Sequence, residues 1–177
     1  MRAVALLVVF GLFVDVHGAS LYDLINALNT TDAIWLYNQS YQDTPEAPNR
    51  TCVRWHKKSL TNSSYVFDND YKQNGTYHTD YNTTAALYEA GGNGSMNVNY
   101  TREGFSSVIV NYTLSMWSGD QKCFVLIRNN DTSGEVQCEL HVWSSSWRGN
   151  HSSCDMNYEE LCGKAQGPEV FSEHECM

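Results

Sequence analysis

The residues best suited to covalent chemistry are six cysteines, and their context favours disulfides over thiol catalysis. They all follow an N-terminal export signal, at Cys52, Cys123, Cys138, Cys154, Cys162 and Cys176. An even number of cysteines in an exported chain predicts three disulfides, although the sequence alone leaves the pairing open. With every cysteine in a disulfide, no thiol remains to act as a nucleophile.

Other catalytic groupings are absent from the sequence. The histidines outside the signal lack metal-ligand spacing; they are His56, His78, His141, His151 and His174. No Gly-x-Ser-x-Gly motif provides a nucleophile elbow. We therefore expect a binding protein that is not an enzyme and that uses no cofactor and no metal.

Asparagine is the residue most open to modification. Eleven Asn-x-Ser/Thr sequons occur, at Asn29, Asn38, Asn49, Asn62, Asn74, Asn82, Asn93, Asn99, Asn111, Asn130 and Asn150. One or two would arise by chance, but so many predict a glycosylated surface. A glycosylated asparagine must face solvent, so each sequon also predicts which way its side chain points.

The N-terminus has the features of a secretion signal. Arg2 supplies a charged start, residues 3–14 are apolar but short for a membrane span, and Val16-His17-Gly18 resembles a cleavage site. We expect a signal peptide at residues 1–18 and one domain at residues 19–177. The mature chain should be secreted and extracellular, without membrane contact.

The charge distribution argues against nucleic-acid binding. The net charge is −9, and the longest basic run is Lys57-Lys58. A protein that binds nucleic acid needs a basic patch to neutralise phosphates. The acidic balance is most simply a solubilising surface charge, although it would also attract small cations.

Eight segments rich in β-branched and aromatic residues follow a short helix. Leu21–Leu28, with Ser20 as its N-cap, has the apolar spacing of an amphipathic helix. The predicted strands are Ala33–Tyr41, Thr51–Leu60, Ser64–Tyr71, Thr76–Glu89, Met96–Arg102, Ser107–Met116, Lys122–Arg128 and Glu135–Trp143. Short turns between them predict an all-β, closed antiparallel barrel, with a sandwich as the alternative. An eight-stranded barrel can hold one small ligand.

One predicted strand also indicates its interior face. Apolar side chains recur at every second position, at Val108, Val110, Tyr112, Leu114 and Met116. The sequon Asn111 lies on the opposite side of that strand. Since a glycosylated side chain faces solvent, we expect the apolar side to face the barrel interior.

Several short motifs occur in a specific order along the chain. After the signal and the helix come Tyr41-x-Asp43-x-Pro45, Thr51-Cys52-Val53, Tyr77-His78-Thr79-Asp80 and Tyr100-Thr101-Arg102-Glu103, then Cys123, Glu139-Leu140, Cys154, a helix and Cys176. This order resembles the tick salivary lipocalins, and among them the tick histamine-binding proteins, over essentially the whole mature chain. The resemblance implies an eight-stranded lipocalin barrel, with a short N-terminal helix and a C-terminal helix packed on the outside. It also implies sequestration of small inflammatory mediators of the host.

The resemblance further implies how the cysteines pair: Cys52–Cys176 and Cys123–Cys154, with Cys138–Cys162 left as the third disulfide. A helix containing Cys162 should lie outside the barrel, so Cys138 points outward. Glu139, His141 and Trp143 then point inward.

The same parity predicts which apolar residues lie on each side of the barrel wall. We expect Val136, Leu140 and Val142 beneath the C-terminal helix. The residues expected in the interior are Val53, Trp55, Phe124 and Leu126.

The resemblance implies a ligand-binding set of Tyr41, Asp43, Asp80, Tyr100 and Glu139. Carboxylates would neutralise the ammonium group of histamine or serotonin, and aromatic faces would stack on its ring. A buried, unpaired carboxylate is costly. Glu139 therefore needs either a cationic ligand or an internal partner such as His141 or Arg128.

Two positions bear on this ligand-binding set. Phe124 stands where the amine binders have an aspartate, so we expect at most one amine site. Asp80 and the sequon Asn82 share parity on a regular strand. Both predictions hold only if a bulge lies between them or if Asn82 carries no glycan.

We therefore expect a secreted monomer that sequesters small host mediators, foremost biogenic amines, and so suppresses host defence during feeding. One alternative is a leukotriene or fatty-acid scavenger, with Arg128 or Arg102 holding the ligand carboxylate. A second is a protein-binding immune modulator on the same scaffold. A third is a carrier glycoprotein without a specific ligand.

Overall fold

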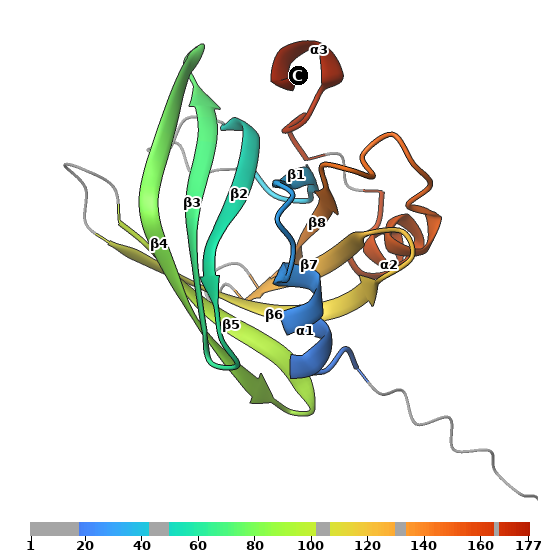
Figure 1. The fold of residues 1–177 in the computed structure, drawn as a ribbon. Coiled ribbons are helices and arrows are strands. Elements are labelled where there is room, and N and C mark those ends of the chain that lie inside the picture. The colour runs from blue at the N-terminus through green and yellow to red at the C-terminus, as the bar shows by residue number, and fades with distance from the viewer. Residues whose placement is uncertain (1–17, 43–49, 102–106, 130–133, 165–166) are drawn as a thin grey trace, which may run out of the picture.

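The barrel predicted from the strand pattern is present in the structure, a computed structural model that describes residues 18–42, 50–101, 107–129, 134–164 and 167–177. Each strand pairs antiparallel with the next, and the last pairs with the first (Figure 1). The strands are β1 (Ile34–Gln39), β2 (Thr51–Leu60), β3 (Ser64–Gln73), β4 (Thr76–Ala90), β5 (Asn93–Tyr100), β6 (Val108–Ser118), β7 (Cys123–Asn129) and β8 (Gln137–Trp143). The closed barrel is therefore confirmed, and the sandwich alternative is wrong.

The helix α1 (Leu21–Leu28) closes one end of the barrel. The predicted cap is present: the Asp23 amide donates to the Ser20 hydroxyl, and the Ser20 amide donates back to the Asp23 carboxylate. The apolar side chains of α1 join the interior cluster, through Leu24, Ala27 and Leu28. The Trp143 indole of β8 donates to the Ala27 carbonyl over 2.9 Å, which fixes the helix to the barrel wall.

Three disulfides connect the barrel to the C-terminal region: Cys52–Cys176, Cys123–Cys154 and Cys138–Cys162. These are the pairs implied by the family resemblance. Two of them hold α2 (Ser152–Cys162) against β7 and β8, and the third ties α3 (Glu173–Cys176) to β2. The bond to α3 spans a sequence separation of 124, and a loop of that length stabilises the fold by about 5 kcal/mol through lost chain entropy. No helix in the described ranges is long and apolar enough to cross a membrane.

Most side chains point to the face of the barrel wall that the alternation along each strand predicts. Trp55, Phe124 and Leu126 belong to the interior cluster. The outer cluster under α2 contains Leu140 and Val142, together with Val125, Tyr158 and the cysteines that bond α2. Cys138 therefore points outward, and its neighbours in β8 point inward.

One predicted orientation, that of Met116, is wrong, and two side chains predicted to be covered, those of Val108 and Val136, are exposed. A register shift between Leu114 and Met116 in β6 turns Met116 outward to the cluster under α2, so that Trp117 packs inside instead. Val108 is 54% exposed because it begins β6, where the barrel wall ends. Val136 is 55% exposed because it precedes β8 and so does not lie beneath the helix.

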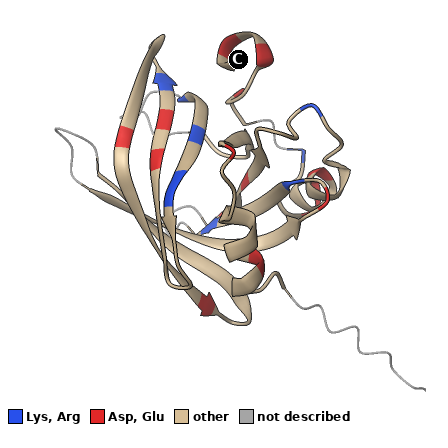
Figure 2. Cartoon of the chain, viewed as in Figure 1, with Lys and Arg blue, Asp and Glu red and all other residues tan. Residues whose placement is uncertain are grey.

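Charged residues of both signs occur along the neighbouring strands β2 and β3 (Figure 2). Arg54 pairs with Asp70 and Lys58 pairs with Asp68, each over 3.1 Å. These cross-strand pairs are partly exposed, so each contributes at most about 1 kcal/mol. They solubilise this part of the wall and leave the interior face to the residues described below.

Gly94 is required where β5 passes closest to α1. A Cβ at this position would lie 2.6 Å from the Ser20 carbonyl oxygen and 2.9 Å from the Leu24 Cβ. Gly94→Ala should therefore lower the free energy of unfolding by about 1 to 3 kcal/mol, because the helix must shift away from the strand. Thermal unfolding would measure this loss.

Gly119→Ala is the matched control for this substitution. A Cβ at Gly119 would make only ordinary contacts, at 3.7 Å or more, with the Trp117 ring. We expect no loss of stability from the control. An equal loss in both variants would contradict the proposed clash between β5 and α1.

Candidate ligand-binding site

Glu139 lies inside the barrel at the centre of a hydrogen-bonded network. Its side chain is buried because the neighbouring Cys138 is bonded outward to α2. The carboxylate accepts hydrogen bonds from the Tyr41 hydroxyl, from the Tyr112 hydroxyl over 3.0 Å and from His141 Nε2 over 3.0 Å. These three donors satisfy the carboxylate within the protein. Of the two partners expected for Glu139, a cationic ligand or an internal side chain, the structure therefore shows the internal one.

These contacts control the ionisation of Glu139. Burial alone would raise the pKa of Glu139, but the hydrogen bond and charge of His141, the bond from Tyr41 and the charge of Arg128 together hold it below its ordinary value. Burial and the Glu139 charge raise the pKa of Tyr112 well above its usual range. The Arg128 guanidinium lies over the Tyr41 ring, 4.7 Å from its centroid. Glu139 is therefore an ionised carboxylate in an aromatic surrounding.

His141 is enclosed between two aromatic rings. Its ring centroid lies 4.5 Å from that of Trp55 and 5.0 Å from that of Phe124, with which it is stacked. Because the Glu139 carboxylate only accepts, Nε2 must carry the shared proton. The other ring nitrogen, Nδ1, is buried and has no hydrogen-bond partner among the described residues. It is therefore open to a group that is not part of the protein.

Asp80 forms a second buried carboxylate, on β4. It is 8% exposed and accepts hydrogen bonds from the Asn69 amide over 3.1 Å and from the Tyr71 hydroxyl over 3.3 Å. Within the described part of the chain, no Lys, Arg or His lies at ion-pair distance from it. The Asn69 carbonyl oxygen beside it is buried without a partner. Two acceptors thus lie together with no cationic side chain of the described residues at ion-pair distance.

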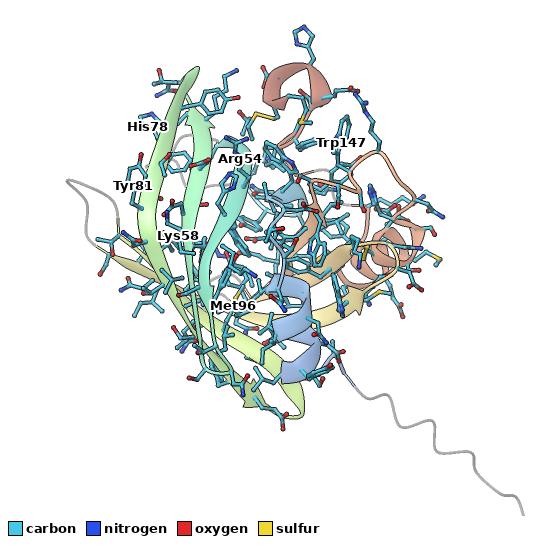
Figure 3. The ribbon with its side chains drawn as sticks, in the orientation of Figure 1. Arg54, Lys58, His78, Tyr81, Met96 and Trp147 are labelled. Carbon is cyan, nitrogen blue, oxygen red and sulfur yellow. A yellow bond between two sulfur atoms is a disulfide. The ribbon has the colours of Figure 1, made fainter. Side chains whose placement is uncertain are left out.

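A β-bulge turns Asp80 inward and the sequon Asn82 outward. Phe67 pairs with Thr83, but Asn69 pairs with Asp80, so β4 has one more residue than β3 over this interval. Asn82 has a positive φ of 53°, and its side chain is exposed. Figure 3 shows the adjacent Tyr81 directed away from the barrel, where it is 73% exposed. The predicted positions of Asp80 and Asn82 are therefore compatible through the bulge.

The two carboxylates lie on different strands of the barrel, Asp80 on β4 and Glu139 on β8, and interior side chains lie between them. Asn69 lies opposite Trp55 in the β2–β3 register, so the two side chains share the inner face. The Trp55 ring in turn contacts His141, which donates to Glu139. The side chains of Asn69, Trp55 and His141 therefore lie in series between Asp80 and Glu139.

Two further tyrosines, Tyr100 and Tyr65, belong to the barrel interior. Tyr100 lies beside Tyr112, and burial together with the Glu139 charge raises its pKa above the ordinary value. Tyr65 is fully buried against Phe67, with ring centroids 4.8 Å apart. The Tyr65 hydroxyl has no partner among the described residues. It adds a third unfilled polar atom to those of Asn69 and His141.

The structure brings together most of the predicted ligand-binding set. Tyr41, Tyr100 and Glu139 meet in one network, and Asp80 lies buried elsewhere in the barrel, on β4. Asp43 lies outside the described residues, as do the sequons Asn49 and Asn130 and the predicted signal through residue 17.

Sequence reasoning missed several residues of the site. Asn69, Tyr71 and Tyr112 contact the two carboxylates but were not in the predicted set. Asn69 could have been found, because it is a polar residue at an inward position between Phe67 and Tyr71 on β3. The bond between Tyr112 and Glu139 has no signal in the sequence, because it depends on two strands curving toward each other.

Glu139 should make stability depend on pH in a definite direction. Its folded pKa lies below the unfolded value of 4.5, so its contribution is present above that pH and is lost as the pH falls through the folded pKa. At neutral pH, Glu139→Gln should lower the free energy of unfolding by about 2 kcal/mol, because three charge-assisted bonds weaken. The difference from the unmodified protein should shrink as the pH falls below 4.5.

Chemical unfolding at several pH values would measure this difference. The exposed Glu89→Gln serves as the control and should show no comparable loss at neutral pH. A stability difference for Glu139→Gln that stays constant from neutral to acidic pH would rule out the ionised network.

The family model for tick histamine binding protein matches residues 17–177. Among solved structures, the chain is similar to lobster apocrustacyanin A1, at 10% sequence identity and a TM-score of 0.45, over 81% of each chain. No curated protein matches the chain by sequence.

Proposed function

The chain belongs to the tick histamine-binding protein family, whose barrel binds small molecules, and from that premise we propose that it is secreted and sequesters histamine or serotonin. Removal of these mediators would suppress host defence during feeding. The observation that carries the choice of an amine is the buried Asp80 carboxylate beside the unfilled carbonyl of Asn69. Among the described residues, no Lys, Arg or His lies at ion-pair distance from it.

An ammonium group matches this part of the interior. It carries positive charge and several N–H donors, whereas Asp80 and the Asn69 carbonyl offer only acceptors. A buried acceptor without a partner costs about 1 to 3 kcal/mol, and a bound donor recovers that cost. The ligand therefore supplies the cation that the described residues do not.

The aromatic part of the ligand has its own partners. Trp55 and Phe67, whose ring centroids lie 5.0 Å apart, present ring faces beside Asn69. A polar atom of the histamine or serotonin ring would pair with one of the two remaining unfilled atoms, His141 Nδ1 or the Tyr65 hydroxyl. Both ends of the ligand would then find unused partners.

Glu139 has a different role in this proposal. Its oxygens are occupied by Tyr41, Tyr112 and His141, so it attracts the cation through its charge and holds those three side chains in position. Asp80 is the carboxylate that contacts the ammonium. A single amine site agrees with Phe124, which fills the position where the amine binders have a second acid.

Sequestration requires tight binding and export but no turnover. A scavenger acts by mass action, so its dissociation constant must lie below the mediator concentration; a nanomolar constant corresponds to about −12 kcal/mol. The three disulfides support an oxidising, extracellular location, since such bonds rarely persist in the cytosol. The predicted signal at residues 1–18 supports the same location.

Calorimetry with histamine, serotonin and leukotriene B4 tests this proposal. We expect heat from an amine at a stoichiometry of about one, and a loss of roughly 10- to 100-fold in affinity in Asp80→Asn, because a charge-assisted bond contributes about 1.5 to 3 kcal/mol. Asp120→Asn removes an exposed carboxylate from the turn after β6 and should leave affinity unchanged.

Two outcomes would favour a ligand other than an amine. Heat from leukotriene B4 and from neither amine would favour the lipid scavenger, with Arg128 holding the carboxylate. A stoichiometric protein captured from host serum, together with no heat from any of the three ligands, would favour the protein-binding alternative. Either result would overturn amine sequestration.

A further inference from the structure

A groove of about 610 Å³ lies on the outside of the barrel, apart from the interior site. Its walls are β1, α2 and the C-terminal segment 167–171. Aromatic rings and carboxylates line it: Tyr37, Tyr158, Phe171, Asp155, Glu159 and Glu169. Its volume falls in the range of pockets that hold compact organic groups.

The sequon Asn38 lines this groove because of a second β-bulge. Leu36 pairs with His141 and Asn38 with Leu140, so β1 has one residue more than β8 over this interval. Tyr37 and Asn38 therefore both face outward, and Gln39 returns to the inner face, where it is 3% exposed. On a regular strand, Asn38 would share the inward parity of Leu36.

Asn82 shows the same arrangement on the other side of the barrel. There too a bulge turns a sequon asparagine outward between residues that face the interior. Two sequons at inward-parity positions are thus both made accessible by an extra residue. Bulges that redirect one side chain are features of the fold, and here both serve an asparagine of the same motif.

We propose that Asn38 carries an N-linked glycan whose first N-acetylglucosamine residues lie in the groove between β1, α2 and segment 167–171. This inference relies on the secretion in the proposed function, because N-glycans are added in the secretory pathway. It does not depend on which ligand the interior binds.

The groove offers the contacts that a sugar needs. The rings of Tyr37 and Phe171, 5.3 Å apart, present apolar faces to the C–H side of a pyranose. Carboxylates of α2, at Asp155 and Glu159, accept hydrogen bonds from sugar hydroxyls. The Tyr158 hydroxyl is buried with no completed hydrogen bond among the described residues, although the Ser40 hydroxyl is near it. It would gain a partner from the acetamido group or a sugar hydroxyl.

Covalent attachment favours a glycan over a free ligand as the occupant of the groove. A group tethered to Asn38 is held at high effective concentration beside these residues, so weak contacts suffice to seat it. The C-terminal wall is held close to β1: a Cβ on Gly167 would lie 1.8 Å from the Gln39 carbonyl oxygen. A seated glycan would bridge β1 to this wall and to α2.

The experiment uses the full chain secreted from insect cells, with Asn38→Gln and the matched control Asn111→Gln. Asn111 lies exposed on β6, outside the groove. Glycopeptide mass spectrometry should find a glycan at Asn38. In the native protein an endoglycosidase should trim the Asn38 glycan at least about tenfold more slowly than the Asn111 glycan, and equally fast after denaturation.

Stability provides the second readout. Asn38→Gln should lower the Tm of the secreted protein by about 2 to 4 °C, whereas Asn111→Gln should not. In refolded protein from bacteria, which lacks glycans, Asn38→Gln should leave the Tm unchanged. This comparison distinguishes the effect of the glycan on Tm from the effect of the asparagine side chain.

Three results would overturn the proposal. An unglycosylated Asn38 in a protein with a glycan at Asn111 would exclude it while leaving secretion intact. Equal trimming at the two sites in the native protein would show that the Asn38 glycan lies outside the groove. A Tm loss of the same size in the bacterial protein would assign the effect to the asparagine itself. Failure of secretion would instead count against the proposed function.

Discussion

The Cys138–Cys162 disulfide fixes the orientation of β8, and the barrel interior depends on that orientation. Successive strand residues point to opposite faces, so bonding Cys138 to α2 on the outside places Glu139 and His141 inside. A slip by one residue would place these two polar side chains beneath α2 and turn Leu140 and Val142 inward. The covalent bond excludes that slip and so preserves the charged network inside an apolar barrel.

The two interior carboxylates differ in how their charge is compensated. Glu139 is surrounded by three donors, one of them an imidazole, and by a nearby guanidinium. Asp80 receives only an amide and a phenol. Burial costs both groups hydration, and among the described residues only the first is compensated by an imidazole and a guanidinium as well as by neutral donors. This inequality, rather than the number of acidic residues, distinguishes a structural carboxylate from one suited to a ligand.

Much of the fold could be predicted because it depends on regular patterns. Alternating apolar residues, polar turns and the order of the cysteines were enough for eight strands, the outer helix and the inward position of Glu139. The errors occur where a register shift interrupts the alternation of inward and outward side chains along a strand. Met116 and Trp117 exchange faces at a register shift, and the bulge at Asn82 was needed to reconcile two predictions. The energetic cost of a bulge depends on neighbouring strands, which a local pattern does not contain.

The site was harder to predict than the fold for a related reason. Tyr41 and Glu139 were expected there, but the bond that joins them connects residues 98 positions apart in the sequence. The unfilled atoms of Asn69, His141 and Tyr65 become apparent only when every buried partner can be counted. Residue types therefore led to the class of ligand that we propose, and the three-dimensional contacts led to the carboxylate proposed to bind it.

The Cys52–Cys176 disulfide makes most of the chain a covalent ring, with a sequence separation of 124 between its ends. A protease that cuts one exposed turn within that ring leaves a single connected molecule, because the cut ends remain joined through the disulfide. Two cuts are needed before any fragment can separate, and the other two disulfides hold α2 to the barrel even then. In the presence of proteases, this topology keeps the cleaved chain covalently connected after the first cut.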